Sequence, residues 1–288
     1  MFKQLVVLIF LVVVSSSTFG QNARTIIQQV LDRDDGKTQY SKQTIATCKY
    51  AIKSRRIKCT EKPRIKILET ANKDYGKNGK DSKSVMIILD PPAERGIGFL
   101  QYDYDDKDKS SDQWMYLSAL GKVKRIVSGS ENEPKTGSLF GSEFGYEDTE
   151  KRHIDDATYS VIKEEKYQGR ETWVIESTPT PQRARKSNYS KSQIWVDKER
   201  FVIMKSKLYD RRGKLVKQMT QSDFIQQDSV WIARKLNMNN VQSKRISTMK
   251  LSKISLNIPV DNKVLTQRVL TDDAFREKHL IDLRKNAF

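Results

Sequence analysis

Apolar and polar residues alternate along most of this chain, beginning near residue 43, which is the pattern of half-buried β-strands. About ten or more such runs follow one another, and turn residues separate them. Clear turns fall at Gln168-Gly169, near Lys198-Glu199 and near Arg212-Gly213. So many consecutive strands with short connections predict one large, curved antiparallel sheet. Such a sheet must curl, close or be covered, because its edges and its apolar face cannot stay exposed.

Three segments break the strand pattern and are expected to cover the sheet. Residues 23–33 place four apolar side chains on one side of a short helix, and residues 269–286 have a second helical pattern. Between the two halves of the chain, residues 137–157 are glycine-rich and acidic, which predicts a loop with a short helix. We expect these segments to lie across the open side of the sheet and to leave a cavity beneath them. The four apolar residues of the first helix are Ile26, Ile27, Val30 and Leu31.

The first twenty residues have the three-part layout of a secretory signal peptide. A basic start at Lys3 precedes an apolar run over residues 5–14, and small residues follow up to Gly20. The apolar run is shorter than the ~20 residues that a membrane-spanning helix needs, so a retained anchor is the weaker alternative. We expect residues 1–20 to be a signal peptide and residues 21–288 to form a single exported domain.

The net charge and the cysteines indicate which kinds of partner and which redox environment to expect. The formal net charge is +17, which attracts polyanions or anionic lipid headgroups, although an ordinary solvated surface is an equal alternative. Nucleic acid is not expected, because no zinc-finger, RNP or basic-zipper pattern is present. A hairpin turning at Lys53-Ser54 would place Cys48 opposite Cys59. Export makes a disulfide between them plausible, and two free thiols are the alternative.

The residues that usually carry catalysis are sparse in this sequence. His153 and His279 are its only histidines, and we interpret both as surface residues without metal-like neighbours. The GSEFG segment at 141–145 differs from the G-x-S-x-G nucleophile elbow in the place of its serine. The acidic clusters at 103–108 and 147–150 lack the spacing of calcium loops and are interpreted as solvated turns. We therefore expect no enzyme activity, no metal and no cofactor.

Residues 91–148 contain the most specific motifs of the chain. They are PPAERGIGFLQYDYDD, DQWMYLSALGKVKRI and GSLFGSEFGYED, in that order. This segment resembles the outer membrane lipoprotein-sorting protein family, relatives of the periplasmic carrier LolA. The shared patterns are Pro-x-x-x-Arg-Gly-x-Gly-Phe-Leu, Trp-x-Tyr-Leu followed by a basic strand, and Gly-Ser-x-Phe-x-Tyr-Glu-Asp. Ser118 stands where the family usually has proline, and the Cys48 and Cys59 pair is not a family feature.

The resemblance implies a mainly β, half-open antiparallel barrel with a helical lid, whose apolar interior receives acyl chains in the periplasm. Met115 and Leu117 alternate with Trp114 and Tyr116, and either face could point inward. The basic strand is a candidate contact for lipid headgroups or for a partner. Candidates for the cavity or lid are Phe99, Met115, Leu117, Leu120, Phe140 and Phe144, and those for the headgroup or partner contact are Lys122, Lys124 and Arg125.

Two functions from different classes follow from these observations. The first is a monomeric periplasmic carrier or chaperone that binds lipid or lipoprotein acyl chains for transfer toward the outer membrane. Burial of apolar chain is worth ~0.8 kcal/mol per CH₂, so a lipid in transit needs an apolar enclosure. The alternative is a ligand-free accessory module that uses the same barrel to dock an inner-membrane transporter.

Overall fold

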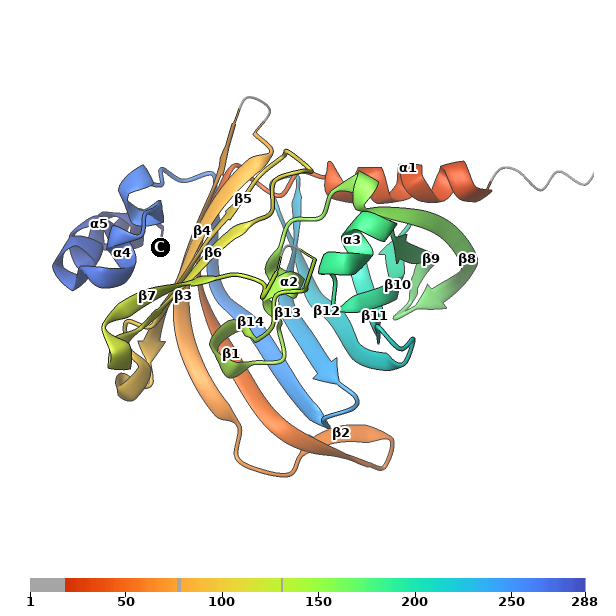
Figure 1. Cartoon of the computed structure of the whole chain (residues 1–288), viewed down its shortest axis with the longest axis horizontal. Coiled ribbons are helices and arrows are strands. Elements are labelled where there is room, and N and C mark those ends of the chain that lie inside the picture. The colour runs from red at the N-terminus through yellow and green to blue at the C-terminus, as the bar shows by residue number, and fades with distance from the viewer. Residues whose placement is uncertain (1–18, 77–78, 131, 288) are drawn as a thin grey trace, which may run out of the picture.

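The computed structural model describes residues 19–76, 79–130 and 132–287, which form one large antiparallel sheet with five α-helices around it (Figure 1). The strands are β1 (Thr38–Lys53), β2 (Arg56–Cys59), β3 (Arg64–Tyr75), β4 (Asp81–Asp90), β5 (Gly98–Asp103), β6 (Asp112–Leu117), β7 (Lys122–Ile126), β8 (Ala157–Tyr167), β9 (Arg170–Pro179), β10 (Tyr189–Asp197), β11 (Ile203–Asp210), β12 (Leu215–Gln227), β13 (Val230–Asn240) and β14 (Arg245–Leu256). The helices are α1 (Phe19–Leu31), α2 (Tyr146–Thr149), α3 (Pro181–Lys186), α4 (Arg268–Thr271) and α5 (Asp273–Ala287).

The strand order gives the sheet two ends that do not meet. It runs β7-β6-β5-β4-β3-β1-β14-β13-β12-β11-β10-β9-β8, and β2 pairs with β1 outside this path. Nearly all neighbours are consecutive strands, while β1 joins β14 and so brings the two halves of the chain together. The sheet curls around an interior and stays open between β7 and β8 (Figure 1). The predicted mainly β, half-open antiparallel architecture is confirmed.

The outer face of the β3 to β7 half is covered by the C-terminal helices. Residues directly opposite one another on paired strands share a face, and Val85, Leu100 and Trp114 are linked in this way. They pack with Leu270 of α4 and Leu280 of α5. The prediction that all the helical segments cover the open side is therefore wrong for α4 and α5. Several outer-face side chains on this half of the sheet are apolar, and only a helix pair outside the barrel can bury them.

The N-terminal helix α1 covers the inner face at the other end of the sheet. Ile26 and Ile27 are buried against Ile175 and Ile194, and Val30 and Leu31 pack at the edge of this cluster. The predicted apolar stripe is confirmed, since the residues spaced three and four apart face the strands. The proposed signal peptide lies mostly outside the described residues, so the structure does not test the cleavage site after Gly20.

The β1–β2 hairpin carries a disulfide between Cys48 and Cys59, whose Cα atoms lie 5.8 Å apart. Its register differs from the prediction, because the turn is formed by Ser54 and Arg55 and Cys59 pairs with Tyr50. The two cysteines are therefore diagonal neighbours on one face of the hairpin. The alternation of apolar residues predicts the strands, but without a glycine the position of the turn stays open by one residue, which shifts the partner of each strand residue by two.

Candidate functional site

The inner face of the sheet carries an apolar patch on β1, on β3 to β7 and on β12 to β14. Phe99 lies directly opposite Met86 on one side and Met115 on the other, which puts these three side chains on the same face. Phe99 is fully buried, and its ring lies parallel to that of Tyr146 at 6.0 Å. The buried and half-buried sheet residues of this patch are Ile45, Leu68, Met86, Ile88, Phe99, Met115, Leu117, Ile126, Met219, Leu236, Met238 and Met249.

Residues 138–150, which we call the inner loop, occupy the space in front of this patch (Figure 1). Leu139, Phe140 and Phe144 are all buried there, against the sheet. The loop doubles back because Phe140 and Gly141 both have positive φ, and the amide of Leu139 donates a 2.8 Å hydrogen bond to the carbonyl of Phe144. Gly141 reaches this conformation without strain, whereas Phe140 is held in it by its packing.

The middle of the inner loop is tied to the sheet through Glu143. Its carboxylate accepts a 2.6 Å hydrogen bond from Arg245 Nε and a 3.0 Å bond from Asn240 Nδ2. Its backbone amide donates to Ser247 Oγ at 2.9 Å. Glu143 is nearly buried, and all three partners belong to β13 and β14. The loop is thus attached by charge-assisted hydrogen bonds, which are stronger than neutral ones.

The C-terminal end of the inner loop is tied by three further carboxylates. Asp148 accepts 2.7 Å bonds from Lys217 Nζ and from the hydroxyl of Tyr189. Glu150 lies 2.8 Å from Lys135, and Arg183 contacts both Glu147 and Glu150 at 3.3 Å. Burial, together with the adjacent Asp148, raises the pKa of Tyr189 far above its usual range. The prediction of a solvated turn at 147–150 is therefore wrong, since these carboxylates are almost fully enclosed by cations.

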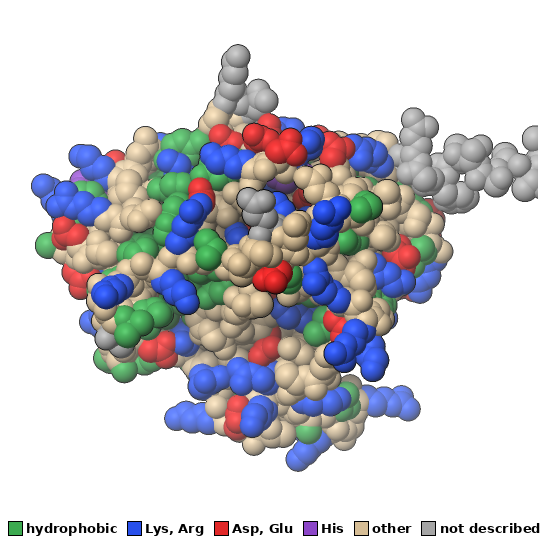
Figure 2. All heavy atoms as spheres, viewed as in Figure 1, with side chains coloured by type: hydrophobic (Ala, Val, Ile, Leu, Met, Phe, Trp, Pro, Cys, Tyr) green, Lys and Arg blue, Asp and Glu red, His purple; other side chains and the backbone are tan. Residues whose placement is uncertain are grey.

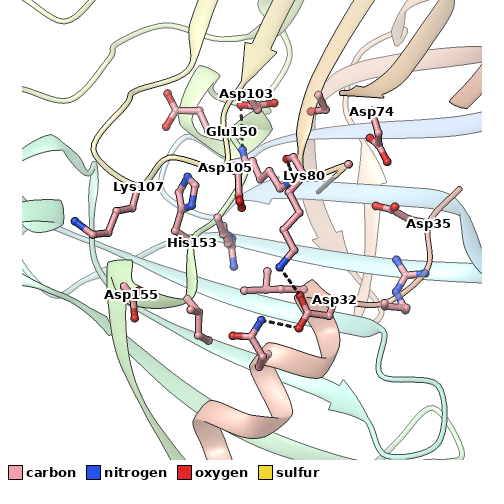
Figure 3. Close-up of a pocket in the computed structure, with 18 of the residues that line it drawn as sticks. Asp32, Asp35, Asp74, Lys80, Asp103, Asp105, Lys107, Glu150, His153 and Asp155 are labelled. Atoms are coloured by element: carbon pink, nitrogen blue, oxygen red, sulfur yellow. Dashed lines mark hydrogen bonds and ion pairs between the residues drawn. The ribbon is translucent and has the colours of Figure 1, made fainter. Parts of the chain in front are cut away.

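A separate polar cavity of about 760 Å³ lies between the end of α1, the β3–β4 and β5–β6 hairpins, and the segment that follows the inner loop (Figure 3). Asp74, Asp103, Asp105 and Glu150 face it together with several cations. Lys80 bridges the opening to Asp32 at 3.2 Å. A cavity lined by so many charges suits water or polar solutes and is a poor environment for an acyl chain. Among residues 19–76, 79–130 and 132–287, no cluster of His, Cys, Asp or Glu has a metal-binding arrangement.

Comparisons with known proteins show which of them have a similar architecture. A domain from Vibrio parahaemolyticus described as an outer membrane lipoprotein-sorting protein matches with a TM-score of 0.75, at 26% identity, over 88% of this chain and 99% of that one. A family model described only as an uncharacterized protein matches residues 80–272, which is more than half of the chain. The chain belongs to the family that this model describes, and its structure is LolA-like, since it matches the lipoprotein-sorting domain over nearly its whole length.

Two more distant structures share the fold of this LolA-like protein. A DUF1329 family protein from Desulfovibrio piger matches with a TM-score of 0.76 at 20% identity, covering 87% of this chain and 98% of its own. A LolA superfamily protein from Nitrosomonas europaea matches with a TM-score of 0.58 at 17% identity, with the same coverage of both chains. A comparison with curated proteins finds no match. Within the described part of the LolA-like chain, no helix is both long and apolar enough to cross a membrane.

The structure brings most of the predicted cavity residues of this LolA-like protein together. Phe99, Met115, Phe140 and Phe144 are buried in one cluster, and Leu117 packs against its edge. Leu120 instead lies in the turn after β6, where its side chain is 66% exposed. The inward face, which the sequence left open, is the one that carries Met115 and Leu117. Whether these residues bind a ligand stays a prediction.

The predicted basic contact residues divide between the two faces of β7. Lys122 and Lys124 are directly opposite Leu117 and Met115, so they lie at the inner edge of the sheet and are exposed. Arg125 is on the outer face and forms an ion pair with Asp112. Only the two lysines are placed where they can meet a molecule at the mouth of the barrel. Their proposed role in headgroup or partner contact remains a prediction.

The two histidines are half-buried and not freely exposed. His153 lines the polar cavity (Figure 3). His279 packs against Phe275, and its Nδ1 lies 3.4 Å from Asp261. The neighbours of His153 in the sequence did not indicate its place in the cavity, because the cavity is formed by segments far apart along the chain.

Asp74, which lines the polar cavity, should make the stability of the protein depend on pH. Burial raises the pKa of Asp74 to about 6, with the nearby Asp35 adding to the rise and Lys151 opposing it. Because the folded state raises the pKa of this carboxyl, ionised Asp74 destabilises the fold. The free energy of unfolding is therefore undiminished by Asp74 below the unfolded-state pKa of ~3.9 and falls as pH rises through 6. We expect Asp74→Asn to increase the free energy of unfolding at pH 7.5 by about 1 kcal/mol, a value reduced for solvent screening, and to have little effect at pH 4.

Urea unfolding at several pH values checks this expectation. The control is Asp223→Asn, which removes an exposed carboxylate paired with Arg234. An equal pH dependence in the wild type and in Asp74→Asn would contradict the assignment.

Proposed function

We propose that this protein is a periplasmic carrier that binds the acyl chains of lipids or lipoproteins on the inner face of its sheet, for transfer toward the outer membrane. The observation that carries the proposal is the apolar patch around Phe99 and Met115, which is covered by the inner loop, including Tyr146 of the one-turn helix α2 within it. An acyl chain offers the same kind of surface as Leu139, Phe140 and Phe144. It can therefore replace the loop without leaving the patch exposed to water.

The free energy of replacing the inner loop by an acyl chain depends on the apolar surface that each of them buries. Each CH₂ of an acyl chain that enters the patch contributes ~0.8 kcal/mol, so a long chain can match the apolar area of three side chains. The ion pairs of Glu143 and Asp148 oppose loop release, because a cation left behind in a nearly buried position loses its partner. The loop would thus leave only for a ligand that buries enough apolar surface, and the empty carrier would not expose its interior.

A structural relative and the N-terminal sequence support lipoproteins as the class of cargo and the periplasm as the compartment. The Vibrio parahaemolyticus domain is described as an outer membrane lipoprotein-sorting protein, and the N-terminal residues of this chain have the layout of an export signal. We infer a periplasmic, non-enzymatic carrier that collects its cargo at the inner membrane, where a transporter is a candidate partner.

One observation favours the second function, an accessory module without a ligand. The inner loop fills the apolar interior completely enough that Leu139, Phe140 and Phe144 are all less than a tenth exposed. A barrel that is permanently filled in this way would act only through its outer surfaces. The two functions therefore differ in whether the loop leaves the patch.

Mass spectrometry of lipid extracted from gently purified protein, combined with fluorescent fatty-acid uptake, tests the carrier. We expect co-purifying lipid, and uptake that falls about tenfold in the double variant Met86→Gln/Met219→Gln, which makes the half-buried rim of the patch polar. The matched control is Ile162→Gln/Ile281→Gln, at two exposed positions outside the patch. Lipid-free protein that takes up no fatty acid would reject the carrier, and capture of a transporter by that same protein would support the accessory module.

A further inference from the structure

The β1–β2 hairpin and its connection to β3 form a projection that we call the basic arm, residues 48–64. Within it, β2 pairs only with β1 and lies outside the main strand order. Residues 52–62 are all exposed, and Pro63, which follows them, is half-buried. Figure 2 shows lysine and arginine gathered on the lobe at the bottom of the view, where Figure 1 places β2. The arm adds little to the hydrophobic core, so a contribution to the core does not explain its shape or its composition.

The basic arm has a concentrated and unneutralised positive charge. It contains seven basic residues and the single acid Glu61, for a net charge of +6. Glu61 accepts a 2.9 Å hydrogen bond from the backbone amide of Lys49. Within the described parts of the chain, no ion pair involves any of the seven basic side chains, whereas Arg170, Arg200 and Arg284 are all paired elsewhere. The seven are Lys49, Lys53, Arg55, Arg56, Lys58, Lys62 and Arg64.

Exposed isoleucines lie on one face of the arm. Ile52 and Ile57 lie directly opposite each other near the tip and are 65% and 44% exposed. Ile65 lies opposite Ala46, which places it on the same face, and it is 52% exposed. Lys53 and Arg56 form the next pair along and point to the other face. The hairpin is therefore amphipathic, with isoleucines on one side and long cations on the other.

The arm is held in shape before it meets any partner. The Cys48–Cys59 disulfide joins its two strands, and the amide of Thr60 donates a 2.9 Å hydrogen bond to the carbonyl of Lys49. The amide of Tyr50 donates to the carbonyl of Lys244, which fixes the base of the arm to the β13–β14 turn. A surface that is already ordered loses less conformational entropy when it binds.

We propose that the basic arm docks this protein onto an anionic lipid bilayer. Ile52 and Ile57 enter the interfacial region, while the lysines and arginines contact lipid phosphates by extending around the thin two-stranded ribbon. The charges lie within the screening distance of the surface and each adds to the attraction. Nucleic acid fits less well, because Tyr50 is the arm's only aromatic residue and is buried, so no ring is available for base stacking.

Docking through the arm would also orient the barrel. Lys49 lies directly opposite Arg245, which holds Glu143 of the inner loop. The end of the barrel next to that ion pair would therefore face the bilayer. This consequence for cargo exchange rests on the proposed carrier function, whereas docking itself does not.

Vesicle flotation of the purified protein tests the proposal. We expect binding to vesicles of phosphatidylcholine with roughly a third phosphatidylglycerol, and little binding to phosphatidylcholine alone. The variant Lys53→Gln/Arg55→Gln/Arg56→Gln/Lys58→Gln should weaken binding at least a hundredfold, since each basic residue is worth about fivefold. The matched control removes four exposed charges elsewhere, as Arg212→Gln/Lys214→Gln/Lys278→Gln/Lys285→Gln, and should keep most of the binding.

A second variant separates the apolar contribution from the charge. Ile52→Ser/Ile57→Ser keeps every cation, and we expect it to bind the anionic vesicles about tenfold more weakly and to be released at a lower salt concentration than the wild type. Equal weakening by the arm variant and the control variant would overturn the proposal, as would failure to bind anionic vesicles while a DNA duplex or an acidic protein is bound. Because flotation does not require fatty-acid uptake, its failure is distinguishable from failure of the carrier function.

Discussion

Glu143→Gln should bind a fluorescent fatty acid about tenfold more tightly than the wild type. Glu143 is nearly buried and accepts hydrogen bonds from Arg245 Nε at 2.6 Å and from Asn240 at 3.0 Å, so it is a main attachment of the inner loop. A hydrogen bond to a charged group is worth about 1.5–3 kcal/mol, which corresponds to a ten- to hundredfold change in an equilibrium constant. Removing the charge weakens the loop-covered state, and a ligand that needs the uncovered patch then binds more tightly.

A fluorescence titration measures this change, and thermal unfolding shows whether the fold persists. The matched control is Glu164→Gln, which removes one carboxylate of an exposed pair with Lys198 and leaves the inner loop intact. Unchanged affinity in Glu143→Gln, with wild-type stability, would show that the loop does not compete with the ligand. That result would favour the accessory module.

Asp197→Ala should lower the free energy of unfolding by about 3–5 kcal/mol, because it removes the fully buried carboxylate at the centre of a partly exposed ionic cluster. The carboxylate of Asp197 has no exposed surface and accepts hydrogen bonds from Arg170 Nε at 2.8 Å and from Arg200 Nη2 at 2.6 Å. It also accepts from the backbone amides of Glu199 and Arg200, both at 3.0 Å. The variant leaves these donors unsatisfied at the β10–β11 turn. Chemical denaturation measures the loss.

The same cluster predicts a loss of stability in acid. Burial alone would raise the pKa of Asp197, but the hydrogen bonds from Arg170, Arg200 and the two backbone amides outweigh it and hold the pKa well below its usual range. Its contribution is therefore full above the unfolded-state pKa of ~3.9 and is lost as pH falls toward the folded-state value. Asp223→Ala, at an exposed pair, should cost less than ~1 kcal/mol. An equal loss in both variants would refute the special role of Asp197.

Local alternation was enough to predict the strands and much of the apolar patch. The turn at Gln168-Gly169 and the apolar stripe of α1 lie where the sequence placed them, because each depends on residues near one another in the chain. Phe99 and Met115 share a face as neighbours on consecutive strands. What alternation leaves open is which face is inside, since both faces of β6 carry large apolar or aromatic side chains.

The contacts that define the site come from long sequence separations. Glu143 meets Arg245 across 102 residues, and Asp148 meets Lys217 across 69. Nothing near Glu147 or Glu150 in the sequence distinguishes a solvated acidic turn from one enclosed by cations. The pairing of β1 with β14 is what brings these partners to one interior.

The sequence by itself determined a mainly β antiparallel sheet, a family resemblance that implies its half-open form, and a basic, disulfide-capable hairpin, because strand periodicity, short motifs and local charge are properties of neighbouring residues. Only the tertiary structure decided that α4 and α5 cover the outer face and that residues 138–150 fill the inner one. It also decided that the basic arm stands clear of the barrel. Curvature and long-range pairing set these arrangements, and neither is encoded in the spacing of residues along a single strand.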